Sequence, residues 1–250
     1  MITSTRLKKV NLAAQAYENI RNLILEQDVS PDDPINIDML ASSLGVSPTP
    51  VREALARLEG DRLVIRLASG RYRVAPALDR KGFADLYDVR MMMEPPVAAA
   101  AARNRPDETV ATLEALVARI AKAGRGQHSR DFVDFVEADR LFHGTIAIAA
   151  GNDFVVSIMD QLQANLRVGP FYRDKGVVDA EAVIEDHAAI CEAIAGRDLA
   201  AAEAAMRGHI ARARALILGW VDDHNAVPAV GSGGGGLRSQ PAREDKFHTA

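Results

Sequence analysis

The sequence predicts a mainly α-helical protein in two parts, a small N-terminal domain and an all-α antiparallel helical bundle. Two observations predict this division. Before residue 78, a short apolar helix, a one-glycine turn and a second helix precede two β-prone segments, whereas from residue 79 to 221 the apolar residues recur at helical spacing only. With 250 residues and 48% hydrophobic content, the chain is long enough for both parts to bury a core.

The turn between the first two of these helices has the residues that a tight turn needs. Leu40 and Leu44 recur at helical spacing, and Gly45 follows where the helix must stop, because glycine enters the left-handed region without a Cβ penalty. Ser47 suits the N-cap of the next helix, and Pro48 suits its first helical position because it has no N–H. We therefore expect one helix to end at Gly45 and another to begin at Pro48.

Flanking segments complete a small domain over residues 13–76. An upstream helix is indicated by an apolar stripe made of Ala16, Ile20, Leu23 and Ile24. Residues 63–67 and 72–74 are β-prone, and the Ser69-Gly70 pair between them favours a turn, so a hairpin is expected. Three helices followed by a hairpin form a winged helix-turn-helix, an arrangement that reads DNA through its second turn helix. The alternative interpretation is a purely structural helix pair.

Six segments with helical periodicity fill the predicted second domain, residues 79–223. They run over residues 81–103, 107–123, 131–150, 154–168, 179–195 and 198–221. Gly, Asn and Pro residues separate them, which is typical of caps and turns and favours an antiparallel bundle. Pro95 and Pro96 lie inside the first segment and predict a kink or a break after Met93, because proline cannot donate a helical hydrogen bond.

The ends and the composition exclude several classes of protein. Residues 1–12 are predicted to be a flexible N-terminus and residues 224–250, which contain a GSGGGG run, a flexible tail. No signal peptide is visible, and no apolar run approaches the roughly 20 residues of a membrane span, so a cytoplasmic protein without a membrane partner is expected. Cys191 is the single cysteine, which excludes an intrachain disulfide and a Cys-based zinc site.

The acidity of the chain lies outside the small domain. Residues 1–78 carry 10 Lys and Arg against 9 Asp and Glu, a net charge of +1. The whole chain has 30 against 34, so the remainder has 20 against 25, a net charge of -5. A domain this weakly positive would depend on local placement of its arginines and on dimerisation for its affinity for DNA.

Three of the six histidines, His143, His187 and His209, fall in predicted bundle helices. Asp139 lies four residues before His143 and therefore on the same helix face. His187 and His209 are each 11 residues from position 198, where the chain should reverse, so both rings should lie at one height, roughly 16 Å from the turn. Three imidazoles and a carboxylate converging in a bundle suit a divalent metal ion such as zinc. The alternative for each histidine is a core residue satisfied by its neighbours.

The segment GVSPTPVREAL, from Gly45 to Leu55, resembles the hallmark GVSRTPVREAL of the GntR superfamily of bacterial transcription regulators, and the likeness covers residues 13–76. It implies that the start of the second helix enters the major groove of DNA. Pro48 stands where the family usually has an arginine, so the family's usual operator is not implied. The side chains then expected at DNA, mainly on phosphates, are Ser47, Thr49, Arg52, Arg57, Arg71 and Arg73. For Arg57 an ordinary solvated surface is the alternative.

Downstream segments resemble the effector-binding domain of the FadR-type subgroup, often called FCD, over nearly all of residues 79–222. The matching segments read DVRMMMEPPVAAAAA, DRLFHGTIAIAAGN, EDHAAICEAIAGRD and AMRGHIARA. In metal-binding members an Asp and three His hold the ion, and here the matching residues are Asp139, His143, His187 and His209. The resemblance implies a divalent ion, zinc first with nickel or manganese as alternatives, beside a small carboxylate effector.

Three further residues are candidates for contacts to that effector. Arg90 lies where the subgroup usually has an arginine, and a guanidinium binds a carboxylate through two parallel hydrogen bonds. Its alternative role is a structural ion pair with a bundle carboxylate such as Glu94. Tyr172 is placed to line or close the cavity, and Asn165 is expected to face back toward Asp139.

Together these features predict a ligand-responsive, sequence-specific DNA-binding transcription regulator, a repressor, that works as a homodimer on a palindromic operator. The first alternative is a metal-dependent enzyme in which Glu185 or Asp186 acts as a base beside His187. The sequence has no HExxH motif and no Ser or Cys nucleophile arrangement to favour it. The second alternative is a degenerate regulator that no longer reads DNA, which Pro48 suggests. The identity of the effector is left open, and an activator remains the alternative to a repressor.

Overall fold

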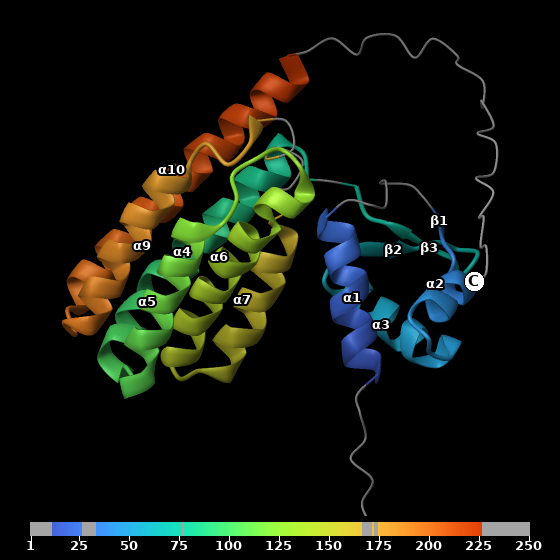
Figure 1. Cartoon of the computed structure of the whole chain (residues 1–250), viewed down its shortest axis with the longest axis horizontal. Coiled ribbons are helices and arrows are strands. Elements are labelled where there is room, and N and C mark those ends of the chain that lie inside the picture. Colours follow the sequence, from blue (N-terminus) through green and yellow to red (C-terminus); the bar gives the residue numbers. More distant parts are fainter. Residues whose placement is uncertain (1–11, 27–33, 77, 167–171, 173–174, 227–250) are drawn as a thin grey trace, which may run out of the picture.

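The computed structural model describes residues 12–26, 34–76, 78–166, 172 and 175–226. Figure 1 shows a small domain beside a larger helical bundle, which confirms the predicted fold class. The small domain contains α1 (Leu12–Glu26), β1 (Pro34–Ile35), α2 (Ile37–Ser43), α3 (Pro48–Gly60), β2 (Val64–Arg66) and β3 (Tyr72–Val74). The bundle contains α4 (Arg80–Asn104), α5 (Asp107–Lys122), α6 (Ser129–Ala149), α7 (Asp153–Asn165), α9 (Ala180–Ala195) and α10 (Leu199–Ala226).

The helix-turn-helix forms as the sequence predicts. Gly45 has a φ of +65°, the left-handed conformation that ends α2 and reverses the chain. Ser47 is the N-cap of α3, although its side chain makes no capping hydrogen bond, and Pro48 is the first helical residue. The inward face of α3 is buried against α1 and the sheet through Val51, Ala54, Leu55 and Leu58. This packing leaves the opposite face of α3 exposed.

The wing is a three-stranded antiparallel sheet with β3 in the centre, in the order β1-β3-β2. Ile65 of β2 lies opposite Arg73 of β3, which confirms the predicted hairpin. On the other side, Ile35 of β1 pairs with Tyr72. Strand β1 is not predicted from the sequence, because two residues are too few to show the alternation by which a strand is recognised.

The sequence predicts a kink or a break after Met93, and the break does not occur. Helix α4 continues through Pro95 and Pro96 to Asn104. Each proline removes one helical hydrogen bond. Tertiary packing offsets this loss, because Pro95 is buried and the next turns bury Val97, Ala98, Ala101 and Ala102 in the bundle core.

The predicted flexible ends are only partly covered by the structure. Residues 1–11 and 227–250 lie outside the described residues. Leu12 already belongs to α1, and α10 continues to Ala226, three residues past the predicted boundary at 223. Among the described helices, none combines the length and apolarity that a bilayer crossing requires.

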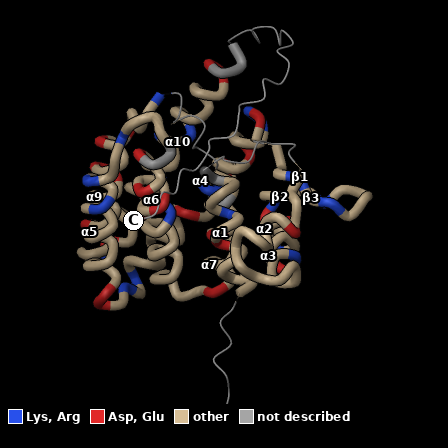
Figure 2. The backbone as a smooth tube through the Cα atoms, turned by 45° about the vertical axis from the view of Figure 1, so that its right-hand side comes forward, with Lys and Arg blue, Asp and Glu red and all other residues tan. Residues whose placement is uncertain are grey.

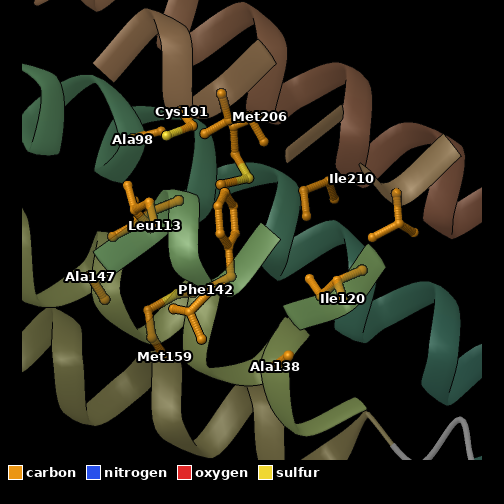
Figure 3. Close-up of a cluster of buried hydrophobic side chains, with 14 of the residues drawn as sticks. Ala98, Leu113, Ile120, Ala138, Phe142, Ala147, Met159, Cys191, Met206 and Ile210 are labelled. Carbon is orange, nitrogen blue, oxygen red and sulfur yellow. The ribbon is translucent and has the colours of Figure 1, made fainter. Parts of the chain in front are cut away.

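A single apolar core holds the bundle helices at fixed positions. Figure 3 shows Phe142 of α6 among Leu113, Ile120, Met206 and Ile210, which come from α5 and α10. Large apolar side chains on both sides of α6 fix the rotation of this helix about its own axis. The polar face of α6, which carries Asp139 and His143, is thereby turned toward α9 and α10.

Candidate metal centre and DNA-binding surface

The structure brings together four of the residues singled out in the sequence. Asp139 and His143 come from α6, His187 from α9 and His209 from α10, and each offers a ligand atom within 4.8 Å of those of the other three. The imidazole of His187 has its ring centroid 4.7 Å from that of His209, as their equal distance from the α9–α10 turn predicts. The three histidines are 1%, 0% and 4% exposed, respectively, so the cluster lies inside the bundle.

The apolar core orients one of these rings. Phe142 stacks on His187 with 3.9 Å between the ring centroids and 6° between the ring planes. Asp139 lies near the edge of the ring, with its Oδ1 atom 3.4 Å from Nε2 of His187. The ring of His187 therefore has an aromatic ring against its face and a carboxylate near its edge.

Several ring nitrogens of the cluster make no protein hydrogen bond within the described part of the chain. These are both nitrogens of His187 and Nε2 of His143, all of them buried. Buried polar atoms are normally satisfied, so each calls for an explanation. Burial, with the neighbouring imidazoles of His209 and His143, lowers the pKa of His187 well below its ordinary value. Burial, with His143, lowers the pKa of His209 to about 3. The two rings are neutral near pH 7 and present lone pairs.

This donor set fits a divalent metal ion. Neutral imidazoles and a carboxylate are the ligands that zinc and related ions take, with bonds of about 2.1 Å, and small side-chain shifts bring atoms spread over 4.8 Å to such distances. An ion would also satisfy Nε2 of His143 and one of the two ring nitrogens of His187. The arrangement therefore supports a metal site, without identifying the metal.

Two carboxylates that the sequence analysis did not assign to the centre lie behind its histidines. Oε2 of Glu94 is 2.6 Å from Nδ1 of His143, and Oδ2 of Asp186 is 3.3 Å from Nδ1 of His209. Metal-binding histidines usually contact a carboxylate through the nitrogen that faces away from the metal, which fixes the ring orientation. The only sequence signal for these contacts is position, because Glu94 lies one helical turn from Arg90 and Asp186 precedes His187.

Arg90 forms a buried ion pair with Glu94, the structural alternative considered for it, and also lines a cavity beside the cluster. Both side chains are almost fully buried. Although burial alone would raise the pKa of Glu94, Arg90 and then His143 lower it below its ordinary value. Arg90, Glu94 and His143 therefore form a continuous series of buried polar contacts that ends at the metal cluster.

The cavity has a volume of about 80 Å³ and reaches Asp139 and His209. Several water molecules or a small organic acid fit in such a space. Tyr172 lines it as expected, and its hydroxyl donates to Oδ2 of Asp179 over 3.3 Å. Burial, and then the charge of Asp179, raises the pKa of Tyr172 well above its ordinary value, so the phenol stays protonated.

Asn165 does not lie at this cavity, contrary to the expectation that it faces Asp139. Its side-chain amide donates to the main-chain carbonyl of Asp61 over 3.1 Å and to that of Gln161 over 2.8 Å. Asp61 is the C-cap of α3, so Asn165 connects the end of α7 to the helix-turn-helix. Gln163 and Leu166, its neighbours in the sequence, line the cavity instead.

The exposed face of α3 carries Thr49 and Arg52, and Ser47 is exposed at its N-terminus. A helix N-terminus attracts phosphate through unpaired amides, but two of the first three helical residues here, Pro48 and Pro50, have no N–H. Thr49 is thus the residue of the first three that offers both an amide and a hydroxyl. Arg52, one turn further on, is the nearest cation of α3.

The remaining candidates for DNA contact differ in their surroundings. Arg57 is exposed, but its guanidinium lies over the ring of Tyr17, 4.2 Å from the ring centroid. Arg71 is exposed at the tip of the β2–β3 hairpin, and Arg73 is half-buried in the central strand. Figure 2 shows basic positions on this protruding hairpin. Of these three, Arg71 is the best placed to meet a DNA backbone.

Comparison with known proteins identifies both halves of the chain. Residues 12–74 match the family of bacterial regulatory proteins called gntR, and residues 85–212 match the FCD domain. The chain belongs to the GntR family. GntR-family regulators bind operator DNA, and this chain is a transcription regulator rather than an enzyme.

Relatives of this GntR regulator include named repressors. The transcriptional repressor GlaR of Escherichia coli (strain K12) is 26% identical over 200 residues, which cover 78% of this chain and 90% of GlaR. The gluconate operon transcriptional repressor of Bacillus licheniformis is 25% identical over 157 residues, or 63% of each protein. The solved structure of E. coli McbR/YncC matches with a TM-score of 0.70 and 22% identity over 83% of this chain and 96% of that one, which supports the same fold.

Proposed function

We propose that this GntR regulator is a cytoplasmic, ligand-responsive repressor in which a divalent metal ion and a small carboxylate metabolite control operator binding. The observation that carries this proposal is the convergence of Asp139 and three buried histidines beside a cavity lined by Arg90. The gluconate operon repressor is a relative named for a sugar-acid operon, which supports an acid as the effector.

Zinc is the proposed ion, because three imidazoles and one carboxylate form a common zinc ligand set, with nickel or manganese as alternatives. When bound, the ion supplies a positive charge that attracts a carboxylate into the cavity. Asp139, His143, His187 and His209 hold it, while Glu94 and Asp186 keep two of the rings in their orientation. Arg90 lines the cavity and adds a second cation for the acid.

Elemental analysis of the protein purified without added metal tests this centre. The wild type should contain about one ion per chain, whereas His187→Ala should contain far less. His128→Ala is the matched control, because His128 is exposed at the N-terminus of α6 and lies outside the cluster. Equal metal contents in the wild type and His187→Ala would contradict the proposed ligand set.

We propose that Thr49, Arg52 and Arg71 contact the operator. Ser47, at the N-terminus of α3, would contact the same DNA phosphate as Thr49. Arg57 and Arg73 are secondary, since one stacks on Tyr17 and the other is half-buried. Pro48 removes the arginine that the family usually places there, so the operator should differ from the family's usual sequence. Selection of genomic fragments by the full chain should enrich one palindrome, and failure to enrich any sequence would favour a degenerate regulator.

The weight of Arg52 can be measured on the selected operator. Arg52→Ala should weaken binding roughly 10-fold and reduce the dependence on salt by about one released ion. Arg207→Ala is the matched control, because Arg207 is exposed on α10 and pairs with Glu203. Equal operator affinities for the two variants would exclude a contact by Arg52.

A palindromic operator implies a homodimer, and we propose that the bundle provides the interface. Large exposed apolar side chains occur on α4, α6 and α7, three helices that pack together. They are Met92, Ile148, Phe154 and Ile158. Phe154 is 84% exposed, so Phe154→Glu should shift the sedimentation of the protein toward the monomer without unfolding it. An unchanged dimer would place the interface elsewhere.

A further inference from the structure

The cavity beside the metal cluster is lined by both domains. Arg21, on α1 of the small domain, lines the same cavity as Arg90, Asp139 and His209 of the bundle. Figure 1 shows α1 on the side of the small domain that faces the bundle. One wall of the proposed ligand cavity therefore belongs to the DNA-binding domain.

Arg21 is buried with little to balance its charge. It is 4% exposed, and its ion pair is with Glu18 on the same helix, over 3.6 Å, whose carboxylate is 59% exposed. A guanidinium has five N–H donors, and an exposed carboxylate at this distance offsets little of the cost of burying it. The side chain is thus in a position where a second anion would be favourable.

Two acids of the bundle that line the cavity, Glu137 and Asp139, have stronger partners than Arg21. Glu137 accepts two hydrogen bonds from Arg140, over 2.9 and 2.7 Å, and its pKa is below the ordinary value; burial opposes this shift and the hydrogen bond from Arg140 causes it. Asp139 belongs to the metal cluster. The charge of Arg21 also lowers the pKa of Glu137, but it contributes less than Arg140 does, and no hydrogen bond joins Arg21 to Glu137 among the described contacts. Arg21 lines the space that a ligand would fill.

We propose that Arg21 is a ligand-contacting residue and that the ligand is a small dicarboxylate, with one carboxylate at the metal centre and the other on the Arg21 guanidinium. This inference rests on the proposed function, because it needs the centre to bind an anion. The planar guanidinium matches a carboxylate through two parallel hydrogen bonds, which an exposed Glu18 at 3.6 Å does not supply.

A ligand held in this way connects the two domains directly. Its metal end is fixed to the bundle helices α6, α9 and α10, and its far end to α1. The small domain already meets the bundle through Asn165 and the carbonyl of Asp61 at the end of α3. The bound dicarboxylate would favour one arrangement of the two domains, which is the differential affinity that control of DNA binding requires.

The test uses the full chain loaded with Co²⁺, whose visible absorption reports an anion entering the metal centre. Succinate and malonate, two dicarboxylates of different length, are titrated against acetate, which has a single carboxylate. In the wild type at least one dicarboxylate should bind about 10-fold more tightly than acetate. Arg21→Gln should lose this roughly 10-fold preference, because the second carboxylate no longer finds a guanidinium. Its affinity for acetate should equal that of the wild type, because acetate does not reach Arg21.

Two further variants keep the result interpretable. Arg21→Lys retains the charge without the planar fork and should give an intermediate affinity for the dicarboxylate, even if Arg21→Gln fails to fold. Arg207→Gln removes an exposed arginine of α10 that pairs with Glu203 and does not line the cavity, and it should behave as the wild type.

The outcomes separate this inference from the metal centre itself. Unchanged dicarboxylate affinity in both Arg21 variants, equal loss of acetate and dicarboxylate affinity, or no preference for a dicarboxylate in the wild type would each overturn the role of Arg21 while leaving the centre in place. Failure of the wild type to bind Co²⁺ would refute the metal centre, and the inference with it.

Discussion

Replacing Glu94 with Gln tests whether the contacts of Glu94 with Arg90 and His143 stabilise the fold, support metal binding, or do both. Glu94 forms an ion pair with Arg90, and the two side chains are 1% and 3% exposed, respectively. The other carboxylate oxygen of Glu94 lies 2.6 Å from Nδ1 of His143. Glutamine has nearly the same shape, so Glu94→Gln creates no cavity. It removes one charge and leaves the guanidinium of Arg90 buried without its partner.

The expected cost follows from this burial. Breaking one side of a buried ion pair typically costs about 3–5 kcal/mol, because the remaining charge stays desolvated. Urea unfolding of the metal-free protein, in the presence of a chelator, should therefore show a free energy of unfolding lower by about 3 kcal/mol. Because Glu94 also orients His143, the affinity for zinc should fall roughly 10- to 100-fold in a competition titration.

Glu203→Gln is the matched control. Glu203 also pairs with an arginine one helical turn away, but both side chains are about half exposed, at 44% and 50%. An exposed pair of this kind contributes less than about 1 kcal/mol. If Glu94→Gln and Glu203→Gln changed the free energy of unfolding by the same small amount and neither altered the zinc affinity, the roles assigned to the buried contacts of Glu94 would be refuted.

Three further predictions concern stability and reactivity. Gly45→Ala should cost about 1 kcal/mol in urea unfolding, because the φ of +65° is unfavourable for alanine although nothing lies within 4 Å of the added Cβ; no change would contradict this. Tyr17→Phe removes a hydroxyl that donates to Asp61 over 2.7 Å and should also cost about 1 kcal/mol, by the same measurement. Cys191 is buried, and burial raises the pKa of its thiol to about 11, so a thiol reagent should label it far more slowly in the native than in the unfolded protein.

The features that the sequence predicts well are those set by local spacing. Asp139 and His143 share a helix face because they are four residues apart, and His187 meets His209 because both are equally far from one turn. The turn at Gly45 and the helix start at Pro48 are likewise encoded by single residues with restricted conformations.

The features that the sequence does not predict depend on contacts between segments that are far apart in the chain. Asn165 meets Asp61 of the other domain, 104 positions earlier, and no periodicity in either segment points to that contact. The contact of Glu94 with His143 requires the relative rotation of α4 and α6, which the whole core determines. The continuity of α4 through Pro95 and Pro96 is a further case, since packing overrides a strong local preference.

Because α4 is a continuous helix, a rotation at one of its ends would displace the other end. Its first residue, Arg80, follows the end of β3 by six positions, while Glu94 lies 14 residues further along the same rod, roughly 21 Å at 1.5 Å per residue. A tilt of about 5° about a pivot at Glu94 displaces the other end by roughly 2 Å over that length. A small tilt of α4 at the histidine cluster would therefore displace by roughly 2 Å the end of α4 that follows the hairpin in the chain.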